Sequence, residues 1–265
     1  MDIHEKLSHL KSLLSSMGSV LVAFSAGVDS TFLLQTAFDT LGENAVAVTA
    51  VSPLTPEAEI QSAVSFCAVR GIEHILFRFD PFTVEHFSEN PPDRCYFCKK
   101  ALFTRFSEIA AERGLSCVAE GSNRDDTDDY RPGMRAVREL KIRSPLLESG
   151  LHKAEIRELS KALGLSIWNK PSCACLASRF AYGEIISPQG LDRVARAEEK
   201  LRSLGFSQLR VRVHGELARI EVPRPELKTA LFHAQEIETS LRTLGFLFVT
   251  LDLGGFQSGS MNRTI

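Results

Sequence analysis

The sequence predicts an α/β fold, in which a doubly wound parallel sheet is followed by a small α+β domain. Short apolar strands alternate with amphipathic helices up to about residue 185. At 19–24 a buried strand runs into a glycine-containing turn and then a helix, which is the opening of a βαβ unit. After residue 187 the order changes to helix, two strands, helix and strand, which is typical of a small α+β domain.

In the first domain, helices are expected where apolar residues recur at helical spacing, and strands where short apolar runs end at turns. The expected helices are 2–17, 31–39, 55–70, 96–112 and 134–140. The expected strands are 19–24, 44–51, 74–79 and 116–120. Helices between short strands favour a parallel sheet with both faces covered, and we expect this domain to span residues 1–185.

The second domain is expected at residues 186–265. A highly charged helix is expected at 191–204, and a second helix at 225–244. Alternating apolar and polar residues predict strands at 208–213 and 218–222, with a last strand at 246–251.

Composition and charge exclude several classes of protein. The 265 residues are 44% hydrophobic and 24% charged, which is the balance of a folded protein with a core. With 31 Lys and Arg against 33 Asp and Glu, the net charge of -2 gives no general field for a nucleic acid, so we expect no nucleic-acid partner. The N-terminal segment lacks the apolar region of a signal peptide, and no apolar run reaches the roughly 18 residues of a membrane span. These observations predict a cytoplasmic protein with no membrane partner.

The cysteines give the first indication of chemistry. Of six cysteines, four form two tight pairs, Cys95-x-x-Cys98 and Cys173-x-Cys175. Since thiols stay reduced in the cytoplasm, these pairs favour metal, cluster or sulfur chemistry over disulfides. Cys67 and Cys117 fall in a helix and a strand pattern, where they are expected to be small buried hydrophobes.

The turn Ser25-Ala-Gly-Val-Asp-Ser30 is the strongest single motif. It lies between a buried strand and a helix, where N–H groups and the helix dipole favour an anion. The hydroxyls of Ser25, Ser30 and Thr31 can add donors. This turn is therefore predicted to cradle phosphate, and it matches neither the Walker-type loop nor the dinucleotide fingerprint.

This turn resembles the SGGxDS pyrophosphate loop of the N-type ATP pyrophosphatases, the PP-loop superfamily, with Ala26 in place of the usual Gly. Other motifs resemble the LarE family of ATP-dependent sulfur transferases over nearly the whole chain. They are Arg94-Cys-Tyr-Phe-Cys-Lys-Lys100, Glu120-Gly-Ser-Asn-Arg-Asp-Asp126, Asp129-Tyr-Arg-Pro-Gly133 and Trp168-Asn-Lys-Pro-Ser-Cys-Ala-Cys-Leu-Ala-Ser-Arg179. The resemblance implies a fold of the adenine nucleotide alpha hydrolase type. It also implies adenylation of a carboxylate of pyridinium-3,5-biscarboxylic acid mononucleotide and its conversion to a thiocarboxylate, in nickel-pincer cofactor biosynthesis.

For the nucleotide chemistry, ATP is expected on Ser25, Gly27, Asp29, Ser30, Thr31 and Gly121, and AMP and pyrophosphate are the expected products. Gly121 is placed at a strand end, on the edge where open α/β sheets bind ligands. Asp125 and Asp126 are predicted to hold Mg²⁺ through waters. Lys99 is predicted to neutralise phosphate charge. The residues expected to act in catalysis are Asp29, Lys99 and Cys175.

Two sulfur chemistries remain open for the cysteines. Cys95, Cys98 and Cys175 are the expected ligands of a [4Fe-4S] cluster with one iron open to sulfide, although the sequence leaves the choice between Cys173 and Cys175 open. In some members of the resembled family, a single cysteine at the position of Cys175 instead gives up its own sulfur and becomes dehydroalanine. The presence of the CxxC pair favours the cluster.

The second domain carries a candidate substrate site. Arg210 and Arg212 are two apart on one strand and share a face, which suits a phosphate or carboxylate. By resemblance, these two arginines with Glu198, Glu221 and Arg179 are assigned to the phosphate end of the substrate or to an oligomer interface that completes its site. The family implies a homo-oligomer, often a hexamer.

Two alternative functions fit the sequence less well. A tRNA thiolase of the same superfamily would need an RNA-binding module or a basic face, which the net charge of -2 does not favour. A regulatory protein that binds zinc or a nucleotide without turnover is disfavoured by the intact loop at 25–30 together with the cysteine pairs.

Overall fold

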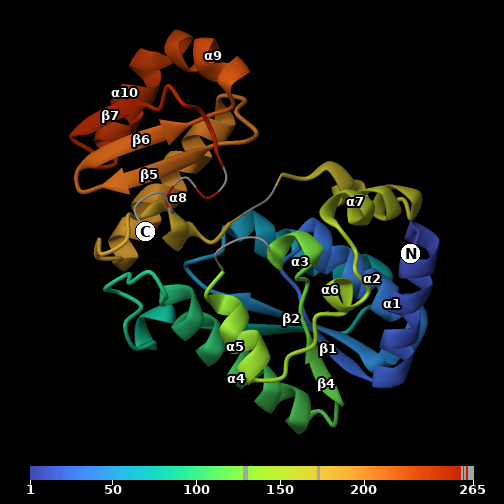
Figure 1. Cartoon of the computed structure of the whole chain (residues 1–265). Helices are drawn as coiled ribbons and strands as arrows, with labels where there is room; N and C mark the ends of the chain where they lie inside the picture. The colour runs from blue at the N-terminus through green and yellow to red at the C-terminus, as the bar shows by residue number, and fades with distance from the viewer. Residues whose placement is uncertain (128–130, 172–173, 258, 260, 262–265) are drawn as a thin grey trace. The chain divides into compact units, whose positions relative to one another are not determined.

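Four parallel strands form the predicted sheet (Figure 1). They are β1 (Val20–Ala23), β2 (Ala45–Val51), β3 (His74–Arg78) and β4 (Cys117–Ala119), in the spatial order β3-β2-β1-β4. The chain moves from β1 to one edge through β2 and β3, and then returns to the other side of β1 as β4. The order therefore reverses between β1 and β4, and open α/β sheets bind ligands at the carboxyl ends of such a pair.

Helices cover both faces of this sheet, as predicted. They are α1 (Ile3–Met17), α2 (Val28–Leu41), α3 (Glu57–Arg70), α4 (Arg94–Glu112), α5 (Gly133–Glu139), α6 (Pro145–Glu148) and α7 (Lys153–Ala162). Val20 and Val22 of β1 belong to a core cluster with α1, α2 and α7, whereas Leu21 belongs to a second cluster with α4 and α5. Alternate residues of a strand point to opposite faces, so the two clusters are the two covered faces of one sheet.

Two local features differ from the sequence prediction. Helix α2 begins at Val28 rather than at Thr31, so Asp29 and Ser30 belong to its first turn. Helix α7 was not predicted; it begins after His152, where the Glu155 side chain accepts a hydrogen bond from the His152 backbone N–H at 2.8 Å. Both differences bring charged side chains to the carboxyl edge of the sheet.

The second sheet has three strands in the order β5-β6-β7: β5 (Arg210–His214), β6 (Leu217–Glu221) and β7 (Phe248–Leu251). Strands β5 and β6 are antiparallel, and β6 and β7 are parallel. The helices are α8 (Pro188–Ser203), α9 (Leu227–Phe232) and α10 (Ala234–Thr243), so the predicted helix at 225–244 is divided at His233. The order helix, two strands, helices and strand is the α+β arrangement expected for this region.

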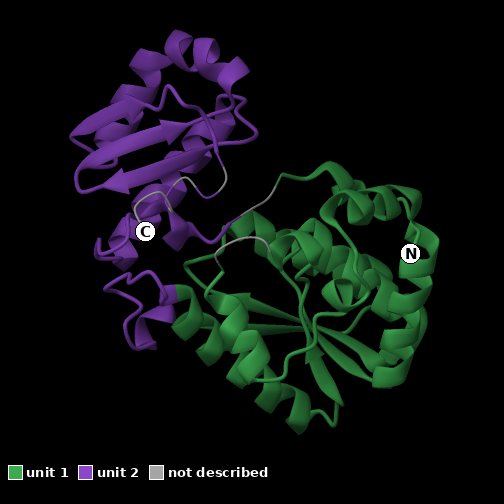
Figure 2. Cartoon of the chain, in the orientation of Figure 1, with its two compact units in different colours: residues 1–80, 95–173 green, residues 81–94, 174–265 purple. Residues whose placement is uncertain are grey.

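The computed structural model describes residues 1–127, 131–171, 174–257, 259 and 261. By its contacts the chain divides into unit 1, residues 1–80 and 95–173, and unit 2, residues 81–94 and 174–265 (Figure 2). The predicted division after residue 185 falls inside unit 2. Within the part of the chain that is described, no helix has the length and apolar character needed to cross a membrane.

Local hydrogen bonds explain why unit 2 includes the segment 81–94. The Asn90 side chain donates to the Ala181 carbonyl at 2.7 Å, and the Gly183 N–H donates to the Asn90 carbonyl at 2.9 Å. Asn90 is fully buried, so these bonds are shielded from water. They tie the segment to the chain around 181–183, which is distant in sequence.

The end of β4 approaches the first turn of α2 so closely that a side chain at Gly121 would be crowded. A Cβ on Gly121 would lie 3.0 Å from the Ser30 nitrogen and 3.4 Å from the Asp29 carbonyl carbon. Both atoms are backbone, so the strain cannot be relieved by rotating a side chain. We expect Gly121→Ala to lower the free energy of unfolding by about 1–3 kcal/mol, measured by thermal and denaturant unfolding.

The matched control is Gly27→Ala. A Cβ there would meet the Ser25 Oγ at 3.4 Å, an ordinary contact, and the Gly27 φ of -80° suits alanine. We expect this variant to unfold near the wild-type temperature. Equal stability of the two variants would contradict the close-approach explanation.

Candidate functional site

The loop at 25–30 lies at the carboxyl end of β1 and leads directly into α2. The Ser25 and Ser30 hydroxyl oxygens are 3.0 Å apart, and the Ser30 hydroxyl donates to the Gly27 carbonyl at 3.2 Å. Because the N-cap residue is Gly27, it has no side chain to cap the first turn of α2. A helix N-terminus of this kind presents backbone N–H groups and a positive dipole end to an anion.

Ala26 adopts a backbone conformation that favours glycine. Its φ is 54°, in the left-handed region, which costs an alanine about 1 kcal/mol. This explains physically why the resembled loop has Gly at this place. Ala26 is nevertheless only 3% exposed and belongs to the core cluster on the α1 and α2 side, so its methyl group is packed.

Lys170 holds this loop from outside its own segment. Its Nζ donates to the Ala26 carbonyl at 3.1 Å and to the Glu59 carboxylate at 2.6 Å. Lys170 belongs to the motif at 168–179, but the sequence predicted no role for it. Its ammonium group brings a positive charge to the loop predicted to hold pyrophosphate.

The Asp29 side chain makes two contacts with other segments of unit 1. It pairs with Lys153, the first residue of α7, and it accepts a hydrogen bond from the Asn123 side chain at 3.3 Å. The structure therefore brings Asp29 and the Gly121 segment together, as the sequence predicted for the carboxyl edge. Lys153 was missed, because no short motif marked a residue so distant along the chain.

Thr31 is placed differently from Ser25 and Ser30. It is 1% exposed, and its hydroxyl oxygen is buried without a hydrogen-bond partner among the described residues. A buried hydroxyl with no partner is unusual in a folded protein. The predicted contact of Thr31 with pyrophosphate stays a prediction.

Lys99 lies on α4, beside the carboxyl end of β4. Its Nζ is 3.9 Å from Glu120, whose carboxylate also accepts from the Ser144 hydroxyl at 2.6 Å and from the Ser122 hydroxyl at 2.8 Å. Glu120 is 6% exposed, so its charge is shared within a small buried polar cluster. A Cβ on Gly133 would lie 2.6 Å from the Lys99 Cδ, so the glycine makes room for the lysine stem.

The two predicted magnesium ligands already have protein partners. Asp125 accepts from the His152 ring at 2.6 Å and from the Lys153 backbone N–H at 2.8 Å, and these bonds hold the pKa of its carboxyl below the ordinary value. Asp126 accepts from the Asn123 N–H at 2.9 Å and pairs with Arg131 at 2.8 Å. All four carboxylate oxygens are thus engaged. A hydrogen-bonded carboxylate oxygen can still accept from water, so the predicted magnesium site at these two residues stays a prediction.

The cysteines fall into both units. Cys95 is exposed and Cys98 is partly exposed, and their spacing of three in the first turn of α4 places them on one side of the helix. Cys175 is exposed in unit 2, and Cys173 lies outside the described residues, as does part of the motif at 129–133. Within the described residues of either unit, no group of three or more His, Cys, Asp or Glu side chains is gathered closely enough to hold a metal ion.

The two remaining cysteines are structural. Cys67 is 1% exposed, and burial raises the pKa of its thiol to about 12. Cys117 is partly buried in β4, and burial raises the pKa of its thiol as well. The prediction that Cys67 is a small buried hydrophobe is confirmed.

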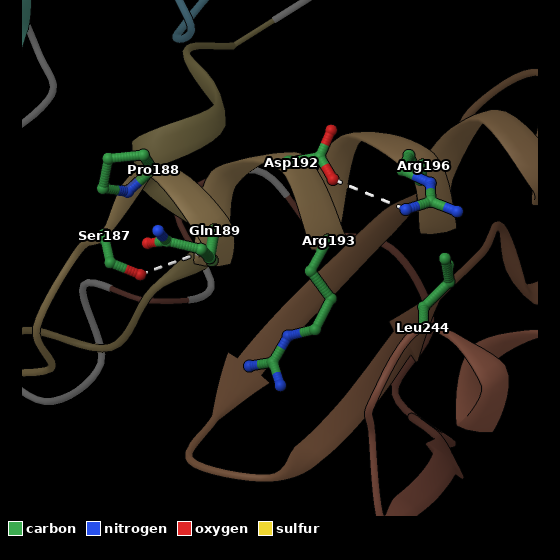
Figure 3. Close-up of a pocket in the computed structure, with 8 residues that line it drawn as sticks. Ser187, Pro188, Gln189, Asp192, Arg193, Arg196 and Leu244 are labelled. Carbon is green, nitrogen blue, oxygen red and sulfur yellow. Dashed lines mark hydrogen bonds and ion pairs between the residues drawn. The ribbon is translucent and has the colours of Figure 1, made fainter.

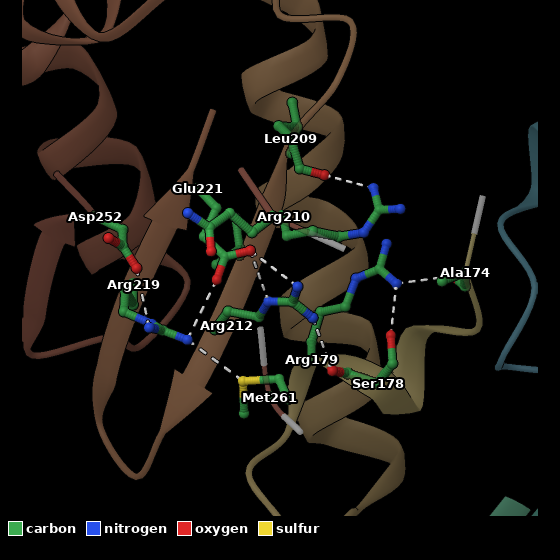
Figure 4. A network of polar contacts seen from close by, with 12 residues as sticks. Ala174, Ser178, Arg179, Leu209, Arg210, Arg212, Arg219, Glu221, Asp252 and Met261 are labelled. Carbon is green, nitrogen blue, oxygen red and sulfur yellow. Dashed lines mark hydrogen bonds and ion pairs between the residues drawn. The ribbon is translucent and has the colours of Figure 1, made fainter. Parts of the chain in front are cut away.

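Arg179 and Glu198 form a buried ion pair in unit 2. Both are 0% exposed, and the guanidinium binds the carboxylate through two bonds, at 2.8 and 2.9 Å. The third nitrogen of Arg179 donates to the Ala174 carbonyl at 2.7 Å (Figure 4) and to the Cys175 carbonyl at 3.1 Å. Both residues were predicted to bind substrate, and the structure gives both of them partners within the protein.

Arg212 and Glu221 form a second buried pair. Arg212 donates twice to one Glu221 oxygen, at 3.0 and 2.9 Å, and Arg219 reaches the other oxygen at 3.3 Å (Figure 4). Burial is the main cause that lowers the pKa of the Arg212 guanidinium, against the opposing effect of Glu221. Arg210 donates to the Leu209 carbonyl at 2.7 Å, and its guanidinium lies 5.1 Å from the centre of the Phe256 ring. The structure therefore places the predicted basic strand beside two carboxylates.

Two cavities lie away from most of these residues. One, of about 380 Å³, is in unit 1 and is lined in part by Asp126, Arg131, Met134 and Ser144. The other, of about 590 Å³, is at the start of α8 in unit 2, and its lining includes Ser187, Arg193 and Arg196 (Figure 3). Among the described site residues predicted from the sequence, only Asp126 lines either of these two cavities.

No family model matches the chain. It is 42% identical over 265 residues to an uncharacterised protein of Synechocystis, with 99% of each chain covered. It is 28% identical over 239 residues to an uncharacterised protein of Methanocaldococcus jannaschii, with 90% of this chain and 91% of that one covered.

A third relative has a named activity. The pyridinium-3,5-bisthiocarboxylic acid mononucleotide synthase of Lactiplantibacillus plantarum is 40% identical over 261 residues, which cover 98% of this chain and 95% of the synthase. The aligned length includes both units and all the motifs quoted above. With this identity along almost its whole length, the chain belongs to the LarE family of sulfur transferases.

Proposed function

We propose that this chain is an ATP-dependent sulfur transferase. It converts a carboxylate of pyridinium-3,5-biscarboxylic acid mononucleotide into a thiocarboxylate, on the way to a nickel-pincer cofactor, and forms AMP and pyrophosphate. The name of the L. plantarum relative supports the product. The observation that carries the ATP dependence is the pyrophosphate-type loop at 25–30, which meets two lysines, Lys153 and Lys170, at the carboxyl edge of the sheet.

This arrangement also favours sulfur transfer over the two alternatives. A tRNA thiolase would need a site for RNA, whereas the match to the synthase leaves little of either chain uncovered. A regulator without turnover is less favoured, because the relative with a named activity is a synthase. The hypothesis of an enzyme therefore accounts for more of these observations than either alternative.

In the proposed first step, a carboxylate oxygen of the substrate attacks the α-phosphorus of ATP, and pyrophosphate leaves. The leaving group gains negative charge, which the N–H groups of the first turn of α2 and the Ser25 and Ser30 hydroxyls are placed to accept. Lys153 and Lys170 would supply positive charge at the same edge. Asp29 orients Lys153 through their ion pair.

In the second step, sulfur replaces AMP on the activated carboxyl. In the sacrificial form, the Cys175 thiolate attacks the acyl carbon and expels AMP, which gives a thioester. Removal of the Cys175 α-proton then breaks the bond between Cβ and sulfur. The sulfur leaves on the substrate as a thiocarboxylate, and Cys175 becomes dehydroalanine.

In the cluster form, which we favour, Cys95, Cys98 and Cys175 would be the ligands of a [4Fe-4S] cluster. Thiols are the usual ligands of such clusters, and both Cys95 and Cys98 lie in the first turn of α4. Such a cluster, when bound by three cysteines, would supply an iron open to sulfide.

Substrate binding is assigned to unit 2. Arg210 and Arg212 lie on β5 and are 7% and 5% exposed, so any phosphate that reached them would be largely removed from water. Guanidinium groups in such surroundings bind phosphate strongly. We also propose that a homo-oligomer completes this site. Sedimentation of the purified chain measures its oligomeric state.

The test of the loop is substrate-dependent release of pyrophosphate from ATP. Asp29→Ala removes the partner of Lys153, and Ser30→Ala removes a hydroxyl donor from the loop. We expect each variant to release pyrophosphate about 10²-fold more slowly than the wild type, with the fold intact. The control Ala26→Gly relieves a left-handed alanine and should keep activity. Unchanged release in both variants would remove the loop from the proposal.

Intact-mass spectra before and after one anaerobic turnover distinguish the two sulfur chemistries. A sacrificial Cys175 would lower the chain mass by about 34 Da, the mass of H₂S, and Cys95→Ala and Cys98→Ala would keep a first turnover. With the cluster, the mass stays constant over several turnovers with sulfide, and each of the three alanine variants loses iron and activity together. A stoichiometric loss of that mass without bound iron would reject the cluster.

The importance of the Lys99 position can be tested without substituting the lysine itself. Gly133→Ala places a methyl group 2.6 Å from the Lys99 Cδ, so the lysine stem must move. Because the Lys99 side chain is flexible and partly exposed, it can move aside, and the unfolding temperature should change little. We expect pyrophosphate release to slow by about 10-fold or more, as for a displaced group in an active site. Wild-type kinetics in this variant would show that Lys99 has no role in this step.

A further inference from the structure

The buried side chain of Arg179 binds the backbone at Ala174 and Cys175. Ala174 and Cys175 are exposed, whereas the next two residues, Leu176 and Ala177, are 2% and 0% exposed. Packing therefore fixes the described chain from Leu176 onward. At Ala174 and Cys175, Arg179 donates hydrogen bonds to both backbone carbonyls.

Arg179 is itself fixed on its other edge. Its Nε and Nη2 bind both oxygens of Glu198, and Glu198 also accepts from the Val211 backbone N–H at 3.1 Å. Burial opposes ionisation of Glu198, but the hydrogen bond and charge of Arg179 outweigh it, so that the pKa of this carboxyl lies below its ordinary value. The guanidinium is thus a rigid connector from α8 and β5 to the Cys175 carbonyl.

The 3-10 turn at Leu176–Arg179 extends this connection. The Ser178 N–H donates to the Cys175 carbonyl at 2.9 Å, and Arg212 donates to the Ser178 carbonyl at 3.0 Å. The Cys175 carbonyl therefore accepts from both Arg179 and the turn. Arg179 is the last residue of this turn, and its side chain also forms the pair with Glu198.

We propose that Arg179, anchored by Glu198, is a positioning residue that fixes the backbone at Cys175 and so presents its thiol for sulfur transfer, and that neither residue binds the substrate. This inference rests on the proposed function. Cys175 lies on an exposed strip of chain, where a displacement of about 1 Å would be enough to slow a reaction by about 10²-fold. Full burial of Arg179 and Glu198 leaves no exposed surface for a ligand.

The first test is hydrogen exchange of the peptide covering 174–180 in the full chain. Arg179→Lys keeps the positive charge but loses the planar fork that reaches Glu198 and the two carbonyls at once. We expect amide exchange in this peptide to become about 10-fold faster, because a charge-assisted hydrogen bond is lost. The peptide covering α10 in the same unit should keep its wild-type rate.

The second test separates catalysis from binding. In Arg179→Lys, we expect the rate of thiocarboxylate formation to fall by about 10²-fold while the KM for the substrate stays within about twofold. Residues that bind the substrate would raise its KM instead. Glu198→Gln, which keeps the shape of the side chain, should change exchange and rate in the same direction and serves if the first variant fails to fold.

Arg202→Ala is the matched control. Arg202 donates to Glu198 at 2.9 Å from one turn along α8, but its side chain is 41% exposed. This variant weakens the charge around Glu198 without removing the bonds to Ala174 and Cys175. We expect wild-type exchange at 174–180 and wild-type sulfur transfer.

The outcomes are distinguishable. A raised KM with unchanged exchange in folded Arg179→Lys, or wild-type exchange and rate in folded Glu198→Gln, would overturn the inference. Failure of the wild type to release pyrophosphate with the substrate would reject the proposed function. Hydrogen exchange would then still decide whether Arg179 restrains the Cys175 segment.

Discussion

The close approach of the end of β4 to the first turn of α2 is the constraint on which the candidate site depends. Gly121 permits it, since any side chain there would meet the Ser30 backbone at 3.0 Å. The same approach brings Asn123 within hydrogen-bond distance of Asp29, which in turn pairs with Lys153. A backbone contact thus determines where the charges lie, and a lysine from a helix late in unit 1 reaches a loop near the start of the chain.

The sequence predicted the parallel sheet, the loop after β1 and the carboxyl edge, because these follow from local patterns of apolar residues and turns. It did not predict Lys153 or the buried role of Glu120, since a lysine on a helix and a glutamate after a strand have no local pattern that marks their partners. The left-handed φ of Ala26 was missed for a related reason, because only the folded loop imposes it. Long-range contacts of single side chains are therefore the part that needed the structure.

The net charge of the chain does not reveal which charged side chains are buried in unit 2. The net charge of -2 gives no sign that arginines and carboxylates are buried together around β5. The sequence placed Arg210 and Arg212 on one face, but not Glu221 against Arg212. Buried pairs of this kind add little net stability, because the cost of removing both charges from water offsets their attraction. Their better-supported value is to fix geometry, as Arg179 does at Cys175.

The motif at 168–179 crosses the division between the two units after residue 173. Its Lys170 holds the Ala26 carbonyl in unit 1, and its Arg179 holds the Cys175 carbonyl in unit 2. In both cases a long cationic side chain fixes a backbone oxygen, and a buried or half-buried carboxylate, Glu59 or Glu198, holds the cation in place. One short stretch of sequence therefore supports both the loop proposed for adenylation and the cysteine proposed for sulfur transfer.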